Sequence, residues 1–262
     1  MRGGNFASTT HAKKARVGDC TSGLEPAKPV AFMKRPIPGG LLIAVEGIDG
    51  AGKTTLATLL AQWCGERGIG CLLSKEPTSL KWGQELRTSA KQGRLTLERE
   101  LELFMKDRRD HVTRSIGPAM QEGNIVILDR YYWSTAAYQG ARGADHWQIV
   151  QDNEAFAPRP DVFLLLDMDV EAGLDRIRKR GDEPNHFESQ DALSTARQIF
   201  LQLATDNPAA CVIDSSGTPK QTFQTALHAL QTAAVEKVRR MHPQDTALLS
   251  RVQDVLGLAS SV

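Results

Sequence analysis

The feature that most constrains this 262-residue chain is the stretch LLIAVEGIDGAGKTT, residues 41–55. Its apolar start, residues 41–45, has the length and β-branched content of a buried strand. Residues 47–54 then match the pattern G-x-x-x-x-G-K-[ST], which is known as the P-loop. A helix is predicted directly after the glycines, because apolar residues follow at helical spacing: Leu56, Leu59, Leu60, Trp63 and Cys64. Strand, glycine-rich turn and helix in this order are the context in which the motif indicates phosphate binding.

The chemistry of the P-loop follows from its residue types. Glycines allow successive backbone N–H groups to point inward around phosphate oxygens, and the helix N-terminus adds positive potential. Lys53 can reach the β- and γ-phosphates, and the hydroxyl of Thr54 can bind Mg²⁺. The alternative is a glycine-rich turn with a chance lysine, which the match at every defined position argues against. The predicted phosphate site comprises Gly47, Ile48, Asp49, Gly50, Ala51, Gly52, Lys53, Thr54 and Thr55.

Charge and composition exclude several classes of protein. The net charge is +1, which argues against a nucleic-acid binder held by bulk electrostatics. The four cysteines form no C-x-x-C pair, so we expect reduced thiols in a cytoplasmic protein rather than disulfides or a zinc site. No apolar run approaches the ~18 residues that a membrane-spanning helix needs. We therefore expect neither nucleic acid nor membrane as a partner.

The two ends of the chain are predicted to lie outside the main domain. Residues 1–40 are polar, contain several Gly and Pro, and carry a net charge of +5, which is typical of a disordered extension. Their composition also resembles a transit peptide, but the Gly and Pro residues would interrupt its amphipathic helix. A passive extension, with Met33 as the true start, is the other interpretation. Residues 241–262 are predicted to form a C-terminal extension containing a short helix, which either packs on the domain or binds a partner.

The middle of the chain alternates strands and helices. Helices are expected between five apolar strands, which are predicted at residues 41–45, 71–74, 125–128, 162–166 and 210–213. This alternation predicts a parallel sheet. The fold class is therefore α/β, a P-loop NTPase-type three-layer sandwich in which helices cover both faces of a five-stranded parallel sheet. We assign it to residues 41–240.

Two further segments carry charged residues at informative positions. Asp129 and Arg130 follow the third strand, where ligands of open α/β sheets bind. This pair suits Mg²⁺ and an anion, although a structural ion pair is the alternative. Arg108 lies in the helical stripe Leu101, Phe104, Met105, Arg108, Val112. Either it points inward and has a partner, or it lies at the rim with its head group in water.

A basic segment follows the fourth strand. Four of the five residues Arg176–Arg180 are basic, and polar residues 182–188 come next. Basic residues at a helix C-terminus can simply complement the helix dipole. Because there are more of them than that role needs, we predict a basic lid over phosphates near residues 176–188.

These motifs together resemble the thymidylate kinase family. The resemblance covers roughly residues 41–235 and rests on EGIDGAGKTT, the EP pair after the second strand, the Phe104–Arg108 spacing, DRY and AYQG. It implies transfer of the γ-phosphoryl group from ATP to dTMP with Mg²⁺, giving dTDP and ADP for dTTP synthesis, in a homodimer. It also implies that Asp49 meets the sugar, Phe104 stacks on thymine and Arg108 hydrogen-bonds to the base.

The remaining roles come from the same resemblance. Arg87 and Arg130 match the arginines that hold the acceptor phosphate, Tyr138 and Gln139 belong to the AYQG segment beside the base, and Asp129 joins Thr54 at Mg²⁺. The P-loop has no arginine of its own, so Arg178 or Arg180 of the lid is expected to supply that charge. Thr78-Ser79-Leu80 replaces the Gly-Gly usual after the EP pair, which leaves the local loop shape open.

Two other functions remain open. A deoxynucleoside kinase has a similar P-loop but needs a general base, for which Glu46 at the end of the first strand is the candidate. A non-catalytic nucleotide-binding regulator is the second alternative. The presence of Lys53, Thr54, Asp129 and Arg130 argues against it, because a binding-only protein does not need the complete set of charges.

Overall fold

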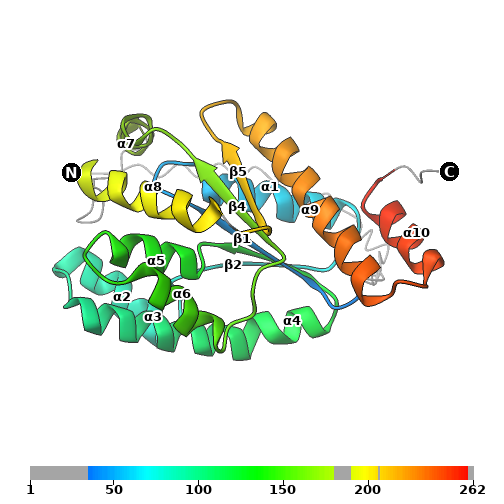
Figure 1. Ribbon diagram of the computed structural model, residues 1–262, viewed down its shortest axis with the longest axis horizontal. Helices are drawn as coiled ribbons and strands as arrows, with labels where there is room; N and C mark the ends of the chain where they lie inside the picture. Colours follow the sequence, from blue (N-terminus) through cyan, green and yellow to red (C-terminus); the bar gives the residue numbers. More distant parts are fainter. Residues whose placement is uncertain (1–34, 180–189, 206, 259–262) are drawn as a thin grey trace, which may run out of the picture. The chain divides into compact units, whose positions relative to one another are not determined.

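The computed structural model describes residues 35–179, 190–205 and 207–258. Its centre is a parallel sheet with the strand order β2-β3-β1-β4-β5 (Figure 1). The strands are β1 (Leu41–Gly47), β2 (Cys71–Lys75), β3 (Ile125–Asp129), β4 (Val162–Asp167) and β5 (Ala210–Asp214). All seven residues of β1 are buried, as expected for a central strand that is covered on both faces. The predicted α/β class and all five predicted strands are confirmed.

Helices cover both faces of this sheet (Figure 1). On one face, α1 (Lys53–Glu66) packs against α9 (Pro219–Met241), and α10 (Thr246–Val255) packs on α9. On the other face lie α4 (Gly117–Gln121), α5 (Tyr132–Gly140) and α8 (Gln190–Thr205). Four more helices lie further out or at the sheet edge: α2 (Lys81–Gln92), α3 (Leu97–His111), α6 (His146–Glu154) and α7 (Val170–Lys179).

Two helix starts are predicted by capping residues in the sequence, Asp169 and the Thr218-Pro219-Lys220-Gln221 capping box, and both are present. The side chain of Thr218 accepts a hydrogen bond from Gln221 N, and the capping box at the start of α9 is complete. The carboxylate of Asp169 accepts hydrogen bonds from Glu171 N and Ala172 N at the start of α7. Short side chains that bind the free N–H groups of the first turn explain why both helices begin where the sequence indicates.

The helical stripe that contains Arg108 predicts a helix over about residues 97–114, and the observed helical path extends further. A π-helical turn, Val112–Ile116, joins α3 to α4, so the helical path continues to Gln121. Pro118 has no N–H and its ring clashes with the carbonyl of a regular preceding turn, and the wider π-turn accommodates it.

The folded unit begins before residue 41. Ile37 is fully buried, its N–H donates to Gly123 O, and Arg35 N–H donates to Gly68 O. Residues 35–40 are therefore part of the domain, whereas composition assigns them to the extension. At the other end, Val252 and Leu256 are buried against the core, so α10 packs on the domain.

Some predicted features lie outside the described residues. These are residues 1–34 of the extension, most of the basic lid including Arg180, and residues 259–262. No helix in the described part of the chain is both long and apolar enough to cross a membrane.

Candidate active site

The P-loop lies at the carboxyl end of β1 and needs its glycines. Gly50 and Gly52 have φ values of 84° and 96°, a region that side chains with a Cβ rarely adopt. A Cβ on Gly50 would also lie 2.3 Å from the carbonyl oxygen of Gly173 in α7. The loop therefore packs directly on α7, and α1 begins at Lys53 with its N-terminus facing the loop.

Lys53 is a buried cation inside this loop. Its Nζ donates to Ile48 O at 2.6 Å and lies 4.0 Å from Asp49 Oδ1. Burial, with the nearby charge of Arg130, lowers the pKa of Lys53 to about 7. Burial disfavours the charged form of the lysine because it removes the ammonium group from water. A phosphate group beside Lys53 would favour the charged form again.

Thr54 and Asp129 lie together next to the lysine. Thr54 Oγ1 donates to Asp129 Oδ2 at 2.5 Å, and Lys75 Nζ lies 3.0 Å from the same oxygen. Asp129 Oδ1 is buried and has no hydrogen-bond partner among the described residues. A hydroxyl beside a carboxylate with one free oxygen fits Mg²⁺ or its bound water.

Among the described residues, no group of three or more His, Cys, Asp or Glu side chains could hold a metal ion. A Mg²⁺ ion at Thr54 and Asp129 would therefore take most of its ligands from phosphates and water, as is usual for this ion at nucleotide sites.

Asp49, Arg130 and Tyr138 form a second cluster across the loop. Arg130 donates to Asp49 Oδ1, and Tyr138 Oη donates to Asp49 Oδ2 at 2.9 Å. Burial acts to raise the pKa of Asp49, but the charges of Arg130 and Lys53 outweigh it and lower the pKa to about 2. Asp49 is therefore an ionised acceptor. Arg130 has φ 74°, an uncommon conformation for a non-glycine residue that is often found at functional sites.

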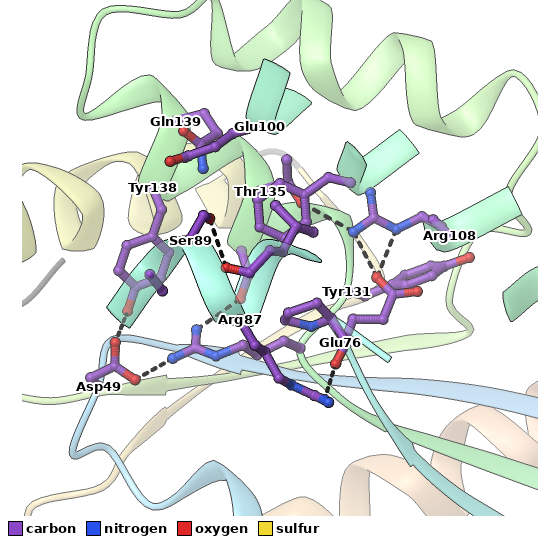
Figure 2. A pocket seen from close by; sticks show the side chains of 16 residues that line it. Asp49, Glu76, Arg87, Ser89, Glu100, Arg108, Tyr131, Thr135, Tyr138 and Gln139 are labelled. Atoms are coloured by element: carbon purple, nitrogen blue, oxygen red, sulfur yellow. Dashed lines mark hydrogen bonds and ion pairs between the residues drawn. The ribbon is translucent and has the colours of Figure 1, made fainter. Parts of the chain in front are cut away.

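These side chains line a cavity of about 210 Å³. All residues predicted to bind the acceptor nucleotide line it: Asp49, Arg87, Phe104, Arg108, Arg130, Tyr138 and Gln139. In Figure 2, Asp49 and Tyr138 lie on one side of the cavity, and Arg108 with Glu76 lies on the other. They come from the segments that follow β1 and β3 and from α2, α3 and α5, so only the folded chain brings them together.

Arg108 points inward and has several partners, which decides between the two interpretations of its helical stripe. It is 1 % exposed. Its Nε donates to Glu76 Oε2 at 2.8 Å, and its Nη1 donates to Asn153 Oδ1 at 2.5 Å. Its Nη2 donates to Thr135 Oγ1 at 3.0 Å.

Gln139 presents a free donor at the cavity. Its Oε1 accepts a hydrogen bond from Arg142 Nη1 at 3.1 Å. Its Nε2 is buried and has no hydrogen-bond partner in the described part of the chain. A buried amide N–H group without a partner is costly, and a carbonyl group of a ligand would satisfy it.

A second cavity, of about 390 Å³, lies on the other side of the P-loop. Gly50, Gly52 and Thr55 line it together with Arg176 and Lys179 of the predicted basic lid, and with four residues that the sequence did not indicate as binding residues: Ser215, Gly217, Pro219 and Thr222. Arg176 Nη2 donates to Ser215 O at 3.0 Å, which joins α7 to the β5–α9 loop. The basic run in the sequence indicated Arg176 and Lys179 as phosphate-binding residues. For Ser215 and Gly217, the only indication in the sequence was their position after the fifth strand.

Two residues considered from sequence lie apart from both cavities. The side chain of Arg178 is 64 % exposed and pairs with Asp175 at 3.0 Å. Glu46 is fully buried and accepts hydrogen bonds from Tyr131 N and Ser134 Oγ at 2.9 and 2.5 Å. Burial raises the pKa of Glu46.

The P-loop lies between two cavities and is surrounded by a buried lysine, a Thr–Asp pair and arginines. This arrangement defines a nucleotide-binding protein of the P-loop phosphotransferase class. Comparison with known proteins identifies the family. The family model described as "Thymidylate kinase" matches residues 45–226, and the chain belongs to this family.

Curated relatives agree. The chain is 54% identical to the thymidylate kinase of Xanthomonas euvesicatoria pv. vesicatoria (strain 85-10) over 198 residues. The aligned region covers 76% of this chain and 86% of the relative. It is 52% identical, with the same coverage, to the thymidylate kinase of Xanthomonas campestris pv. campestris (strain B100). It is 49% identical over 191 residues to that of Xylella fastidiosa (strain M12), which covers 73% of this chain and 87% of the relative.

Proposed function

We propose that this protein transfers the γ-phosphoryl group of ATP to dTMP and so produces dTDP and ADP for dTTP biosynthesis. The observation that carries the proposal is the pair of cavities that meet at the P-loop. The larger cavity, with Arg176 and the β5–α9 loop, suits the nucleoside of ATP. The smaller cavity, with its arginines and an aromatic side chain, suits a nucleoside monophosphate.

The reaction needs no protein nucleophile, because an oxygen of the acceptor phosphate attacks the γ-phosphorus. The protein must therefore hold the two substrates in line and neutralise the charge on the transferred group. Arg87 and Arg130 hold the acceptor phosphate, and Lys53 neutralises the β- and γ-phosphates. Thr54 and Asp129 would hold Mg²⁺, which would supply further positive charge at the phosphates.

The groups around the nucleoside of dTMP have distinct chemistry. The ring of Phe104 offers a face for stacking, and Arg108 and Gln139 offer N–H donors for the carbonyl groups of thymine. The ionised carboxylate of Asp49, held by Tyr138 and Arg130, offers an acceptor for the sugar hydroxyl.

The lid, the oligomeric state and the location belong to the same proposal. Arg178 or Arg180 supplies charge to the transferred phosphoryl group when the lid covers it. The protein acts as a cytoplasmic homodimer, as the family resemblance implies. Light scattering at working concentration tests the dimer directly, and a monomeric mass would contradict it.

The structure favours dTMP kinase over a deoxynucleoside kinase. A hydroxyl acceptor needs a general base, and the candidate Glu46 lines neither described cavity. Its carboxylate is already bound by Tyr131 N and Ser134. A buried carboxylate that accepts these hydrogen bonds is poorly placed to take a proton from a substrate.

A steady-state assay of ADP release tests the proposal against both alternatives. The acceptors are dTMP, dUMP and thymidine, and a reaction without acceptor is the control. We expect turnover with dTMP and little with thymidine or without acceptor. Turnover with thymidine alone would indicate a deoxynucleoside kinase, and no turnover above the control with any acceptor would indicate a binding-only protein.

A further inference from the structure

The guanidinium of Arg108 is almost fully used by the protein itself. It has five N–H donors in a fixed plane. Nε contacts Glu76 Oε2 at 2.8 Å, and Nη2 contacts the same oxygen at 2.6 Å and Thr135 Oγ1 at 3.0 Å. Nη1 donates one of its hydrogens to Asn153 Oδ1. Among the described residues, these contacts account for every donor except one hydrogen on Nη1.

The charge of Arg108 is neutralised in the same way. Glu76 is 3 % exposed and pairs with Arg108 through one oxygen, while its other oxygen lies 3.0 Å from His111 Nδ1. Because the carboxylate balances the guanidinium, the cavity meets a single oriented donor rather than a free positive charge. The direction of that donor depends on whatever holds the other hydrogen of Nη1.

Asn153 holds that hydrogen and does not contact the cavity itself. It lies in α6, is fully buried and is absent from the residues that line the cavity. Its Oδ1 accepts from Arg108 at 2.5 Å, and its Nδ2 donates to Ile149 O at 2.7 Å. The second contact fixes the rotation of the side-chain amide and so aims Oδ1 at the arginine.

We propose that Asn153 is a positioning residue for base selection. It holds Nη1 of Arg108 so that one N–H points into the cavity at an acceptor on the pyrimidine. This inference rests on the proposed function. Thymine has a carbonyl at position 4, whereas cytosine has an amino group that cannot accept from this N–H. Asn153 thus favours dTMP over dCMP without touching either.

The test uses two variants that are close to Asn in size. Asn153→Leu removes the acceptor, and Asn153→Asp keeps an oxygen for Arg108. For each variant and the parent, kcat and KM are measured with dTMP, dCMP and ATP, together with Tm. Asn124→Leu is the matched control, because Asn124 is also buried but precedes β3 and hydrogen-bonds to Glu122.

We expect Asn153→Leu to lower kcat/KM for dTMP roughly tenfold or more, which is the usual effect of losing a hydrogen bond to a charged group. KM for ATP should stay within about twofold of the parent. The preference for dTMP over dCMP, which is the ratio of the two kcat/KM values, should also fall roughly tenfold or more. Asn153→Asp should restore part of the preference, because it keeps an acceptor for Arg108 but loses the hydrogen bond to Ile149 O. Asn124→Leu should leave the preference unchanged, whatever its effect on Tm.

Several outcomes would overturn the inference. An unchanged preference for dTMP in a folded Asn153→Leu variant would do so. Equal loss of the preference in Asn153→Leu and Asn153→Asp would also do so. If Asn153→Leu lowers Tm and changes the KM values for dTMP and ATP equally, Asn153 only stabilises α6. If instead the parent fails to use dTMP, the proposed function itself fails, and the inference fails with it.

Discussion

Burial acts on Lys53 and Asp49 in the same sense, toward their neutral forms, but only the pKa of the lysine follows it. The pKa of Lys53 falls to about 7, whereas the pKa of Asp49 falls to about 2 because Arg130 and Lys53 lie beside it. Asp49 lies beside two cations, whereas burial and the charge of Arg130 outweigh the effect of Asp49, Asp129 and Glu46 on Lys53. The nearby carboxylates therefore do not offset the burial of Lys53, and the phosphates of a nucleotide would add negative charge there.

Lys53→Met should separate activity from stability. We expect kcat to fall by roughly 10²-fold or more, because a charge at the transferred phosphates is lost. Tm should stay the same or rise, since a desolvated cation is removed. Lys106→Met, on the outer face of α3, is the control and should change neither. A folded Lys53→Met variant with kcat within about threefold of the parent would contradict the role of the P-loop.

Glu46→Gln should change how stability depends on pH. Burial raises the pKa of Glu46 in the folded protein above 4.5, its ordinary value. The folded state then binds more protons than the unfolded state, so its stability falls as pH rises from about 4.5 through the raised pKa. Gln keeps the shape and carries no such proton. In urea unfolding at pH 5 to 8, the variant should therefore gain stability relative to the parent as pH rises. A pH-independent difference would contradict the raised pKa.

Among the helices, α2 shows how backbone packing fixes a functional residue. Thr78 N and Oγ1 donate to Asp107 of α3 at 2.7 and 2.6 Å, so the loop before α2 is held by α3. Gly83 lets α2 approach that loop, because a Cβ at this position would lie 2.1 Å from Thr78 O. Arg87, one turn later, donates to Pro77 O in the same loop.

Two glycine-to-alanine changes in helices test this packing. Gly83→Ala should lower Tm by roughly 5 °C or more, because the new methyl group overlaps backbone atoms. It should also raise KM for the acceptor by displacing Arg87. Gly65→Ala in α1 is the matched control, since a Cβ there meets nothing within 4 Å, and it should stabilise the protein by about 0.4–1 kcal/mol. Similar Tm values for the two variants would contradict the close approach.

At the scale of the whole molecule, the short segment before β1 belongs to the domain. Ile37 is buried in the core, and the backbone of residues 35–41 bonds to Gly68, Gly123 and Asn124. These bonds join the loop that precedes β2 and the loop that precedes β3. The segment thus closes the end of the sheet opposite the active site.

Two truncations locate this boundary. A chain that begins at Met33 should melt and turn over like the full chain, because the described contacts begin at Arg35. A chain that begins at Gly40 loses the burial of Ile37, which is about 1.5–3 kcal/mol for such a side chain. Its Tm should fall by several degrees, as expected for a domain of this size, while KM for ATP stays unchanged. Equal melting of the two truncated chains would mean that Ile37 does not contribute to stability.

The sequence alone determined the features that depend on local patterns. Continuous apolar runs predicted all five strands, and the capping residues Asp169 and Thr218 marked helix starts. The P-loop motif and seven of the sixteen residues that line the smaller cavity also came from sequence, the latter through resemblance to a family. Such features are predictable because strand length, helical period and capping depend on residues close together in the chain.

Only the tertiary structure decided what depends on distant segments. The partners of Arg108 come from positions 27, 32 and 45 residues away in the chain, so its stripe was compatible with a rim or a buried position. Ser215 and Gly217 line the larger cavity only because the fold brings the segment after β5 to the same cavity as the P-loop. Glu46 was a plausible base until Tyr131 and Ser134 were seen to occupy its carboxylate. A side chain's partners and burial depend on which elements pack together, and the spacing of residues along one element does not contain that information.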